Sequence, residues 1–269
     1  MSQVHEAVSD YLTIRRAMGY KLEKAPRFLN QFADYLDDQG AATVTTELAL
    51  AWARLPADQH PNLWATRLSA VRGFAAYLQT IDPATEVPPS DLLPLKQRRS
   101  TPYLYSDAEV AALLRAAGTL RPALRALTYE TLIALLAVTG LRIGEALGLD
   151  RGDVDLSKGL LLVRDGKFGK SRQVPLHPTT VAALDGYLAA RKRLCPAPGT
   201  PALFITATPR RLRPQLAQKV FRRLVELAAL KRRSGSCRPR LHDLRHTFAV
   251  NALLAAGAER LERHLEVRP

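Results

Sequence analysis

The sequence predicts a mainly α-helical protein of two domains, with one small antiparallel β-hairpin or sheet in the second domain. Three observations predict this fold class. Apolar residues recur at helical spacing over most of the 269 residues. A proline-dense segment, residues 82–102, interrupts the helical pattern. Two short apolar runs flank a glycine-bearing turn at residues 165–172, which is typical of a hairpin.

The first 80 residues are expected to form helices. Two apolar stripes follow helical spacing near the N-terminus, and Gly19 and Gly40 mark their ends. A later stripe from Trp64 to Leu78 advances in regular steps of four and three residues. We interpret the aromatic residues of these stripes as core residues rather than as platforms for stacking bases.

A tether is expected between the two domains. Five prolines fall within residues 82–102, and proline at this density favours an extended chain. Three basic residues lie between positions 96 and 99. We therefore place a helical domain at 1–95, a basic linker at 96–102, and a second domain at 103–269.

The second domain is expected to be mostly helical. Ser106 and Glu109 have the spacing of a capping box, which predicts a helix that extends to Ala117. An apolar helix over 127–138 breaks at Thr139-Gly140. The pattern then predicts these further elements: a short helix over 141–149, hairpin strands at 160–163 and 173–176, helices near 179–193, 214–230 and 242–256, and an extended piece at 203–205.

The net charge of +14 lies entirely in the second domain. Residues 1–100 contain 11 basic and 11 acidic side chains, which leaves 28 basic against 14 acidic in the remainder. Such a field attracts polyanions, and nucleic acid is the usual partner. A solvated basic face, or a role at a ribosome or membrane surface, would account for the charge alone equally well.

Composition excludes several classes of protein. Apolar residues make up 47% of the chain, too many for a disordered protein. No apolar run approaches the ~20 residues that span a bilayer. The N-terminus lacks a secretory signal, so we expect a cytoplasmic protein without membrane contact. Cys195 and Cys237 are too few for a disulfide framework or a four-cysteine zinc site.

Arg142 lies just after the Thr139-Gly140 break, at the start of a predicted helix. Glu145 is three residues further along the same helix face and is therefore placed to hold the arginine. An exposed ion pair of small energetic effect is the alternative, and this segment alone favours the alternative.

The hairpin turn carries three basic residues, Lys167, Lys170 and Arg172. A lysine at the tip of a hairpin reaches away from the sheet into a neighbouring groove. Spacing alone does not choose among the three.

His242 and Arg245 are three residues apart at the expected start of a helix, so both lie on one face near its partly positive end. That arrangement favours an anionic ligand. His246 is four residues from His242, so a metal-binding pair is the alternative. No third ligand has suitable spacing, and we expect no metal.

Together these segments resemble the tyrosine recombinase (phage integrase) family, with its Xer-like members. The family's T-G-L-R-x-x-E-x-L box matches residues 139–147, its G-K-x-x-K-x-R-x-V-P-L box matches 166–176, and its H-x-x-R box matches 242–245. The resemblance implies a helical, SAM-like core-binding domain and a catalytic domain that clamp double-stranded DNA. It further implies homo-tetramers that act on two DNA sites.

The resemblance also implies a mechanism without metal or cofactor, in which a tyrosine hydroxyl attacks a DNA phosphodiester and forms a 3′-phosphotyrosine. Arg142 and Arg245 would neutralise the phosphate. Lys167 would protonate the leaving 5′ oxygen. His242 would support the phosphate and assist proton transfer, and Glu145 would orient the Arg142 region.

The family's nucleophile has no counterpart in this sequence. The family places its tyrosine after the H-x-x-R box, whereas all eight tyrosines here lie between positions 11 and 187. The family's leucine-glycine-histidine step is also missing, with His264 as a faint counterpart. We therefore expect a chain that is truncated at its C-terminus and inactive alone.

Three functional classes follow. The first is a site-specific recombinase or transposon-type integrase that has lost its C-terminus. The second is a non-catalytic DNA-binding remnant that occupies recombination sites. The third is a phosphodiesterase that uses water. A covalent DNA adduct would contradict our expectation and would point to an upstream tyrosine such as Tyr105 or Tyr129.

Overall fold

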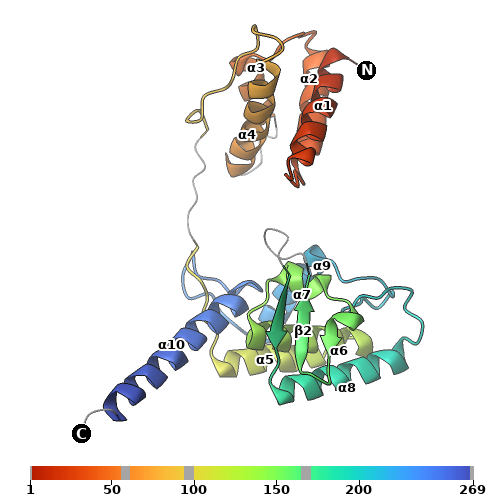
Figure 1. Ribbon diagram of the computed structural model, residues 1–269, viewed down its shortest axis with the longest axis vertical. Coiled ribbons are helices and arrows are strands. Elements are labelled where there is room, and N and C mark those ends of the chain that lie inside the picture. The colour runs from red at the N-terminus through yellow and green to blue at the C-terminus, as the bar shows by residue number, and fades with distance from the viewer. Residues whose placement is uncertain (1, 56–60, 94–99, 165–170, 267–269) are drawn as a thin grey trace. The chain divides into compact units, whose positions relative to one another are not determined.

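The computed structural model of the protein describes residues 2–55, 61–93, 100–164 and 171–266, with side chains described as far as residue 257 (Figure 1). The chain divides into two compact units, Met1–Arg99 and Ser100–Pro269. Each unit has its own hydrophobic core.

The described part of the first unit is helical, with α1 Gln3–Ala17, α2 Ala25–Asp38, α3 Thr46–Arg54 and α4 Pro61–Leu78. Thr45 is the N-cap residue of α3, since its side chain accepts a hydrogen bond from the Leu48 amide at 3.2 Å. Phe32 and Trp52 are buried, with ring centroids 5.1 Å apart. The interpretation of the aromatic stripes as core is confirmed for Phe28 and Phe32 of α2.

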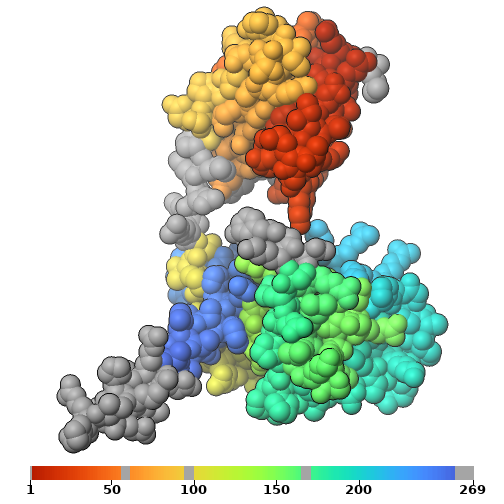
Figure 2. Space-filling model, in the orientation of Figure 1, coloured from red at the N-terminus to blue at the C-terminus, as the bar shows by residue number. Residues whose placement is uncertain are grey.

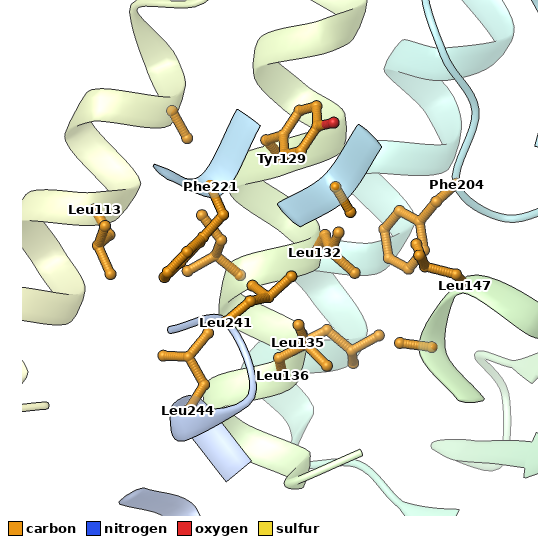
Figure 3. Packing of buried hydrophobic residues seen from close by; sticks show 14 of the residues in the cluster. Leu113, Tyr129, Leu132, Leu135, Leu136, Leu147, Phe204, Phe221, Leu241 and Leu244 are labelled. Carbon is orange, nitrogen blue, oxygen red and sulfur yellow. The ribbon is translucent and has the colours of Figure 1, made fainter. Parts of the chain in front are cut away.

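The second unit is built around α6 (Ala123–Thr139), which packs against α5 (Asp107–Gly118), α8 (Pro178–Leu194) and α10 (Asp243–Glu266). Leu132, Leu135 and Leu136 of α6 form the centre of a cluster that also receives Phe221 from α9 (Pro214–Leu227) (Figure 3). Residues from most elements of this unit thus share one core.

The predicted start of α5 is confirmed. The Glu109 amide donates to Ser106 Oγ at 3.2 Å, and Glu109 Oε2 accepts from the Ser106 amide at 2.8 Å. The helix predicted from residue 127 begins earlier, because Pro122 precedes its first turn at Ala123 and proline is well tolerated at a helix start.

The small sheet has three antiparallel strands in the order β1-β2-β3. They are β1 Val154–Asp155, β2 Leu160–Val163 and β3 Arg172–Pro175, and Val163 pairs with Arg172. A short 3₁₀ turn, η1 Arg151–Asp153, precedes β1. The predicted hairpin is confirmed, whereas β1 has only two residues and is too short to produce a periodic signal. Figure 2 shows the green surface of these strands and α8 as one continuous face of the second unit.

Two further segments differ in detail from the prediction. Residues 203–205 form no strand of the sheet: Ile205 makes an isolated bridge with Arg211, and the preceding Ala202 makes one with Asp150. Helix α10 extends to Glu266, beyond the predicted end at 256, because residues 258–266 favour helix and contain no proline. Among the described residues, no helix is long and apolar enough to cross a membrane.

Candidate active site

The turn at Gly140 brings two distant segments together. Gly140 ends α6 in the left-handed conformation, with φ of 60°, which glycine adopts without steric cost. A Cβ atom placed there would collide with the ring of Phe248 on α10, with Cε1 only 2.9 Å away. The turn is therefore packed directly against the first part of α10.

Arg142 and Arg245 both lie at this turn. Arg142 is the N-cap residue of α7 (Ile143–Gly148), two residues after Gly140. Arg245, in the first turn of α10, donates from Nη1 to the Gly140 carbonyl. The structure thus places near one turn two arginines that the sequence separates widely, and a pair of guanidiniums is well suited to bind a phosphate group.

Glu145 connects Arg142 with Arg172, the first residue of β3. Arg142 Nη1 lies 2.8 Å from Glu145 Oε1, and the Arg142 amide lies 2.9 Å from Oε2. Arg172 binds the same carboxylate through both terminal nitrogens, at 3.1 and 2.8 Å. The Glu145 side chain is only 7% exposed, so this ion pair is shielded from solvent on one side.

The electrostatics of Glu145 follow from these contacts. Burial by itself raises the pKa of the carboxyl, but the hydrogen bonds from Arg172 and Arg142 outweigh burial and lower the pKa to about 2. Glu145 is therefore ionised throughout the physiological pH range. It is placed to orient the two arginines rather than to transfer protons.

His242 lies one residue before α10, beside a cavity lined by Ile143, Phe221, Arg222, Arg238, Arg240 and His242 itself. Its ring meets that of His246 edge-on, with centroids 5.0 Å apart. Partial desolvation, followed by the nearby His246, lowers the pKa of His242 below its usual value of 6.5. The imidazole is therefore mainly neutral at pH 7 and is able to accept a proton.

Several hydrogen bonds hold the turn that carries His242. Arg240 binds the buried carboxylate of Asp243 at 3.0 and 3.2 Å. Tyr105 donates from its hydroxyl to the Arg240 carbonyl at 3.0 Å, and its amide donates to Thr247 Oγ1 at 2.9 Å. Arg240 also reaches the Thr101 carbonyl at 3.4 Å. The first residues of the second unit are thus bonded to both sides of His242.

The tyrosines of the second unit are all buried: Tyr103, Tyr105, Tyr129 and Tyr187. Tyr129 donates to the Leu216 carbonyl at 3.4 Å, and burial raises its pKa to about 12. Burial likewise raises the pKa of Tyr105. A buried hydroxyl with a raised pKa is a poor nucleophile, so neither Tyr105 nor Tyr129 has the environment of an attacking group.

Two of the predicted site residues, Lys167 and His264, have side chains outside the described part of the chain. Lys167 lies outside the described residues, as does Lys170. His264 falls within α10, but its side chain is outside the described part of the chain. Spacing did not choose among the three basic hairpin residues. Of these, Arg172 lies in the described part of the chain, where it forms an ion pair with Glu145.

The sequence interpretation did not identify the link between Arg172 and Glu145. The residues come from different elements, and no local spacing rule connects a helix residue with a strand residue 27 positions away. A shared acidic partner for two arginines becomes visible only in three dimensions. Among the described residues, no group of three or more His, Cys, Asp or Glu side chains could hold a metal ion, so the pair His242 and His246 has no third ligand there.

The chain is similar to known integrases and recombinases. Residues 104–260 match the Phage integrase family. The chain is 44% identical to y4rB of Sinorhizobium fredii, described as an integrase/recombinase, over 94% of this chain and 83% of that protein. It is 35% identical to tyrosine recombinase XerD of Mycobacterium tuberculosis, over 93% of this chain and 84% of the relative.

Solved structures share the fold. A lambda integrase dimer bound to a COC′ core site has a TM-score of 0.64 at 19% identity, over 91% of this chain and 69% of that one. A lambda integrase tetramer bound to a Holliday junction has a TM-score of 0.63 at 18% identity, over 91% and 68%. The chain belongs to the phage integrase family of tyrosine recombinases, which carry out DNA recombination.

Proposed function

We propose that this chain binds double-stranded DNA at recombination sites and that Arg142, Arg245 and His242 surround one phosphodiester. The observation that carries the proposal is that Arg142 follows the Gly140 turn in the chain while Arg245 binds the Gly140 carbonyl. Two guanidiniums donate paired hydrogen bonds to phosphate oxygens and stabilise the charge that develops when the phosphorus is attacked. His242 and Ile143, the residue after Arg142, line the same cavity, which brings the histidine to this region.

The proposed division of labour follows from residue chemistry. Arg142 and Arg245 bind the phosphate, and Glu145 orients Arg142. His242, mainly neutral at pH 7, accepts or relays the proton of an attacking hydroxyl. Lys167 is assigned the protonation of the leaving 5′ oxygen, on the basis of its position in the hairpin box of the sequence.

The proposed partner is DNA, in an assembly of several copies. The excess of basic side chains after residue 100 supports phosphate binding. Lambda integrase, which shares the fold, has been solved on DNA as a dimer and as a tetramer. We assign this chain to the same kind of homo-oligomer on two DNA sites, acting in the cytoplasm.

We further propose that the 269-residue chain binds DNA without cutting it. No tyrosine follows Tyr187 in the sequence. The four tyrosines of the second unit are buried, and burial raises the pKa of each hydroxyl. This is the observation that favours the second candidate function, occupation of recombination sites by a non-catalytic chain. A longer chain with a tyrosine beyond residue 269 would be the active recombinase.

One experiment tests binding and cleavage together. A fluorescent mixed-sequence duplex with an internal nick is titrated with the chain at several salt concentrations and then denatured to reveal covalent adducts. We expect affinity to fall steeply with salt, because bound phosphates release counterions, and we expect no adduct. The Arg142→Ala variant should bind more weakly, with the slope of log affinity against log salt reduced by about one.

Each part of the proposal has its own contradicting result. Affinity that does not depend on salt would overturn DNA binding through phosphates. A covalent adduct would overturn the non-catalytic assignment, and mapping the attached peptide would identify the nucleophile. Unchanged binding by Arg142→Ala would remove Arg142 from the phosphate site.

A further inference from the structure

We propose that Arg172 is a positioning residue, which occupies the Glu145 carboxylate in a two-point contact and so leaves most of the Arg142 guanidinium available to a DNA phosphate. The inference rests on the proposed function, because it concerns how Arg142 meets that phosphate. It assigns to Arg172 a role other than direct contact with DNA.

The contacts show how the carboxylate is shared. Arg172 approaches with both terminal nitrogens, Nη1 to Oε1 at 3.1 Å and Nη2 to Oε2 at 2.8 Å. This is the parallel arrangement in which arginine and a carboxylate bind most strongly. The Arg142 side chain makes one bond to Glu145, from Nη1 at 2.8 Å, while its backbone amide occupies Oε2.

Charge leads to the same conclusion. One carboxylate faces two guanidiniums, so the group as a whole keeps one positive charge, and the two arginine side chains are 41% and 40% exposed. If Arg172 were absent, the Glu145 carboxylate would have room for a parallel two-point contact with Arg142. That contact would neutralise Arg142 and occupy the donors that a phosphate requires.

The geometry distinguishes arginine from lysine at position 172. A lysine preserves the charge but is a single point without the planar fork, so it cannot fill both carboxylate oxygens in one orientation. The substitution Arg172→Lys therefore separates the positioning role from a general contribution of positive charge. Because Arg172 is partly exposed at the first residue of β3, we expect the substitution to keep the fold.

The test is a double-mutant cycle on DNA affinity, measured by fluorescence anisotropy with a mixed-sequence duplex. The four proteins are the unmodified chain, Arg142→Ala, Arg172→Lys and the double variant. We expect Arg142→Ala to weaken binding about tenfold, as the loss of one charge-assisted contact does. Arg172→Lys should weaken it by several-fold, and the double variant should bind no more weakly than Arg142→Ala alone.

The matched control is Arg164→Lys. Arg164 lies directly after β2 in the same hairpin, and its Nη2 forms an ion pair with Asp153 Oδ1 at 2.6 Å. The control therefore makes the same change, arginine to lysine, in an ion pair that does not involve Glu145. We expect this variant to bind DNA as the unmodified chain does.

Each remaining outcome overturns the inference. Full affinity of Arg172→Lys would show that Arg172 contributes charge alone. A loss that persists in the Arg142→Ala background would show that Arg172 acts independently of Arg142. If Arg142→Ala itself binds normally, the proposed phosphate role of Arg142 fails and the inference fails with it. If only Arg172→Lys is without effect, the proposed function stands and the inference alone is wrong.

Discussion

Glu145 holds its charge beside two arginines while almost excluded from solvent. The carboxylate also accepts the Arg142 amide, so it caps the first turn of α7 and fixes the direction in which Arg142 leaves the backbone. At the scale of single residues, the site therefore depends on a buried acid that does not react.

The protonation of Glu145 links this site to stability. Its pKa in the folded protein is about 2, below its usual 4.5, so the folded state favours the charged form. The corresponding stabilisation, about 3 kcal/mol, is fully present above pH 4.5 and is lost as the pH falls towards 2.

We expect Glu145→Gln to unfold more easily than the unmodified chain at pH 7, and the difference in the free energy of unfolding to shrink as the pH is lowered from 4.5 towards 2. Denaturant unfolding at a series of pH values measures this difference. A difference that stays constant over that range would show that Glu145 has an ordinary pKa.

Gly140→Ala should destabilise the second unit by about 2–3 kcal/mol, because the left-handed backbone and the ring of Phe248 both oppose a side chain there. Gly144→Ala is the control, since a Cβ at that helical glycine meets nothing within 4 Å. We expect the control to be neutral or slightly stabilising, as alanine favours helix. Thermal unfolding followed by circular dichroism compares the two, and equal shifts would contradict the packing argument.

At the scale of elements, α7 is too short to be stable by its backbone hydrogen bonds alone, and side chains hold both of its ends. Glu145 holds the first turn. Arg211 holds the last, donating from Nη1 to the carbonyls of Leu147 and Gly148 at 2.9 Å and of Leu149 at 3.1 Å. A guanidinium also complements the partly negative C-terminal end of the helix.

Arg211→Ala should therefore lower the free energy of unfolding by about 2 kcal/mol and destabilise α7 locally, because three carbonyls lose a charged donor. Arg210→Ala, which removes an exposed arginine from the neighbouring position, should change stability by less than about 0.5 kcal/mol. Hydrogen exchange of the amides of Ala146 and Leu147 reports on α7 directly. Unchanged protection in Arg211→Ala would show that packing alone holds the helix.

The elements with local signals were predictable. The capping box at Ser106, the break at Gly140 and the hairpin strands each depend on residues within a few positions of one another, and the structure confirms them. The ion pair of Arg142 with Glu145 was predictable for the same reason. The contacts of Arg245 with Gly140 and of Arg172 with Glu145 join distant segments, so no local pattern encodes them.

At the scale of the whole molecule, the two units differ in composition as well as in position along the chain. Both tryptophans, Trp52 and Trp64, belong to the first unit, and Trp52 is buried in its core. The basic excess belongs to the second. Separate cores favour unfolding as separate units.

We therefore expect tryptophan fluorescence to report the unfolding of the first unit alone. Gly140→Ala should lower the circular dichroism transition that belongs to the second unit and leave the fluorescence transition where it is. Coincident transitions that shift together would show that the two units unfold cooperatively.

The bonds around Tyr105 have a mechanical consequence. The chain enters the second unit at Ser100, and within the next few residues Thr101 and Tyr105 are tied to Arg240 and Thr247, on either side of His242 and Arg245. Tension applied to the first unit would travel along the chain and arrive at these bonds before it reaches the sheet or α8. The turn that carries His242 is thus among the first parts of the second unit to be loaded by a pull on the first unit.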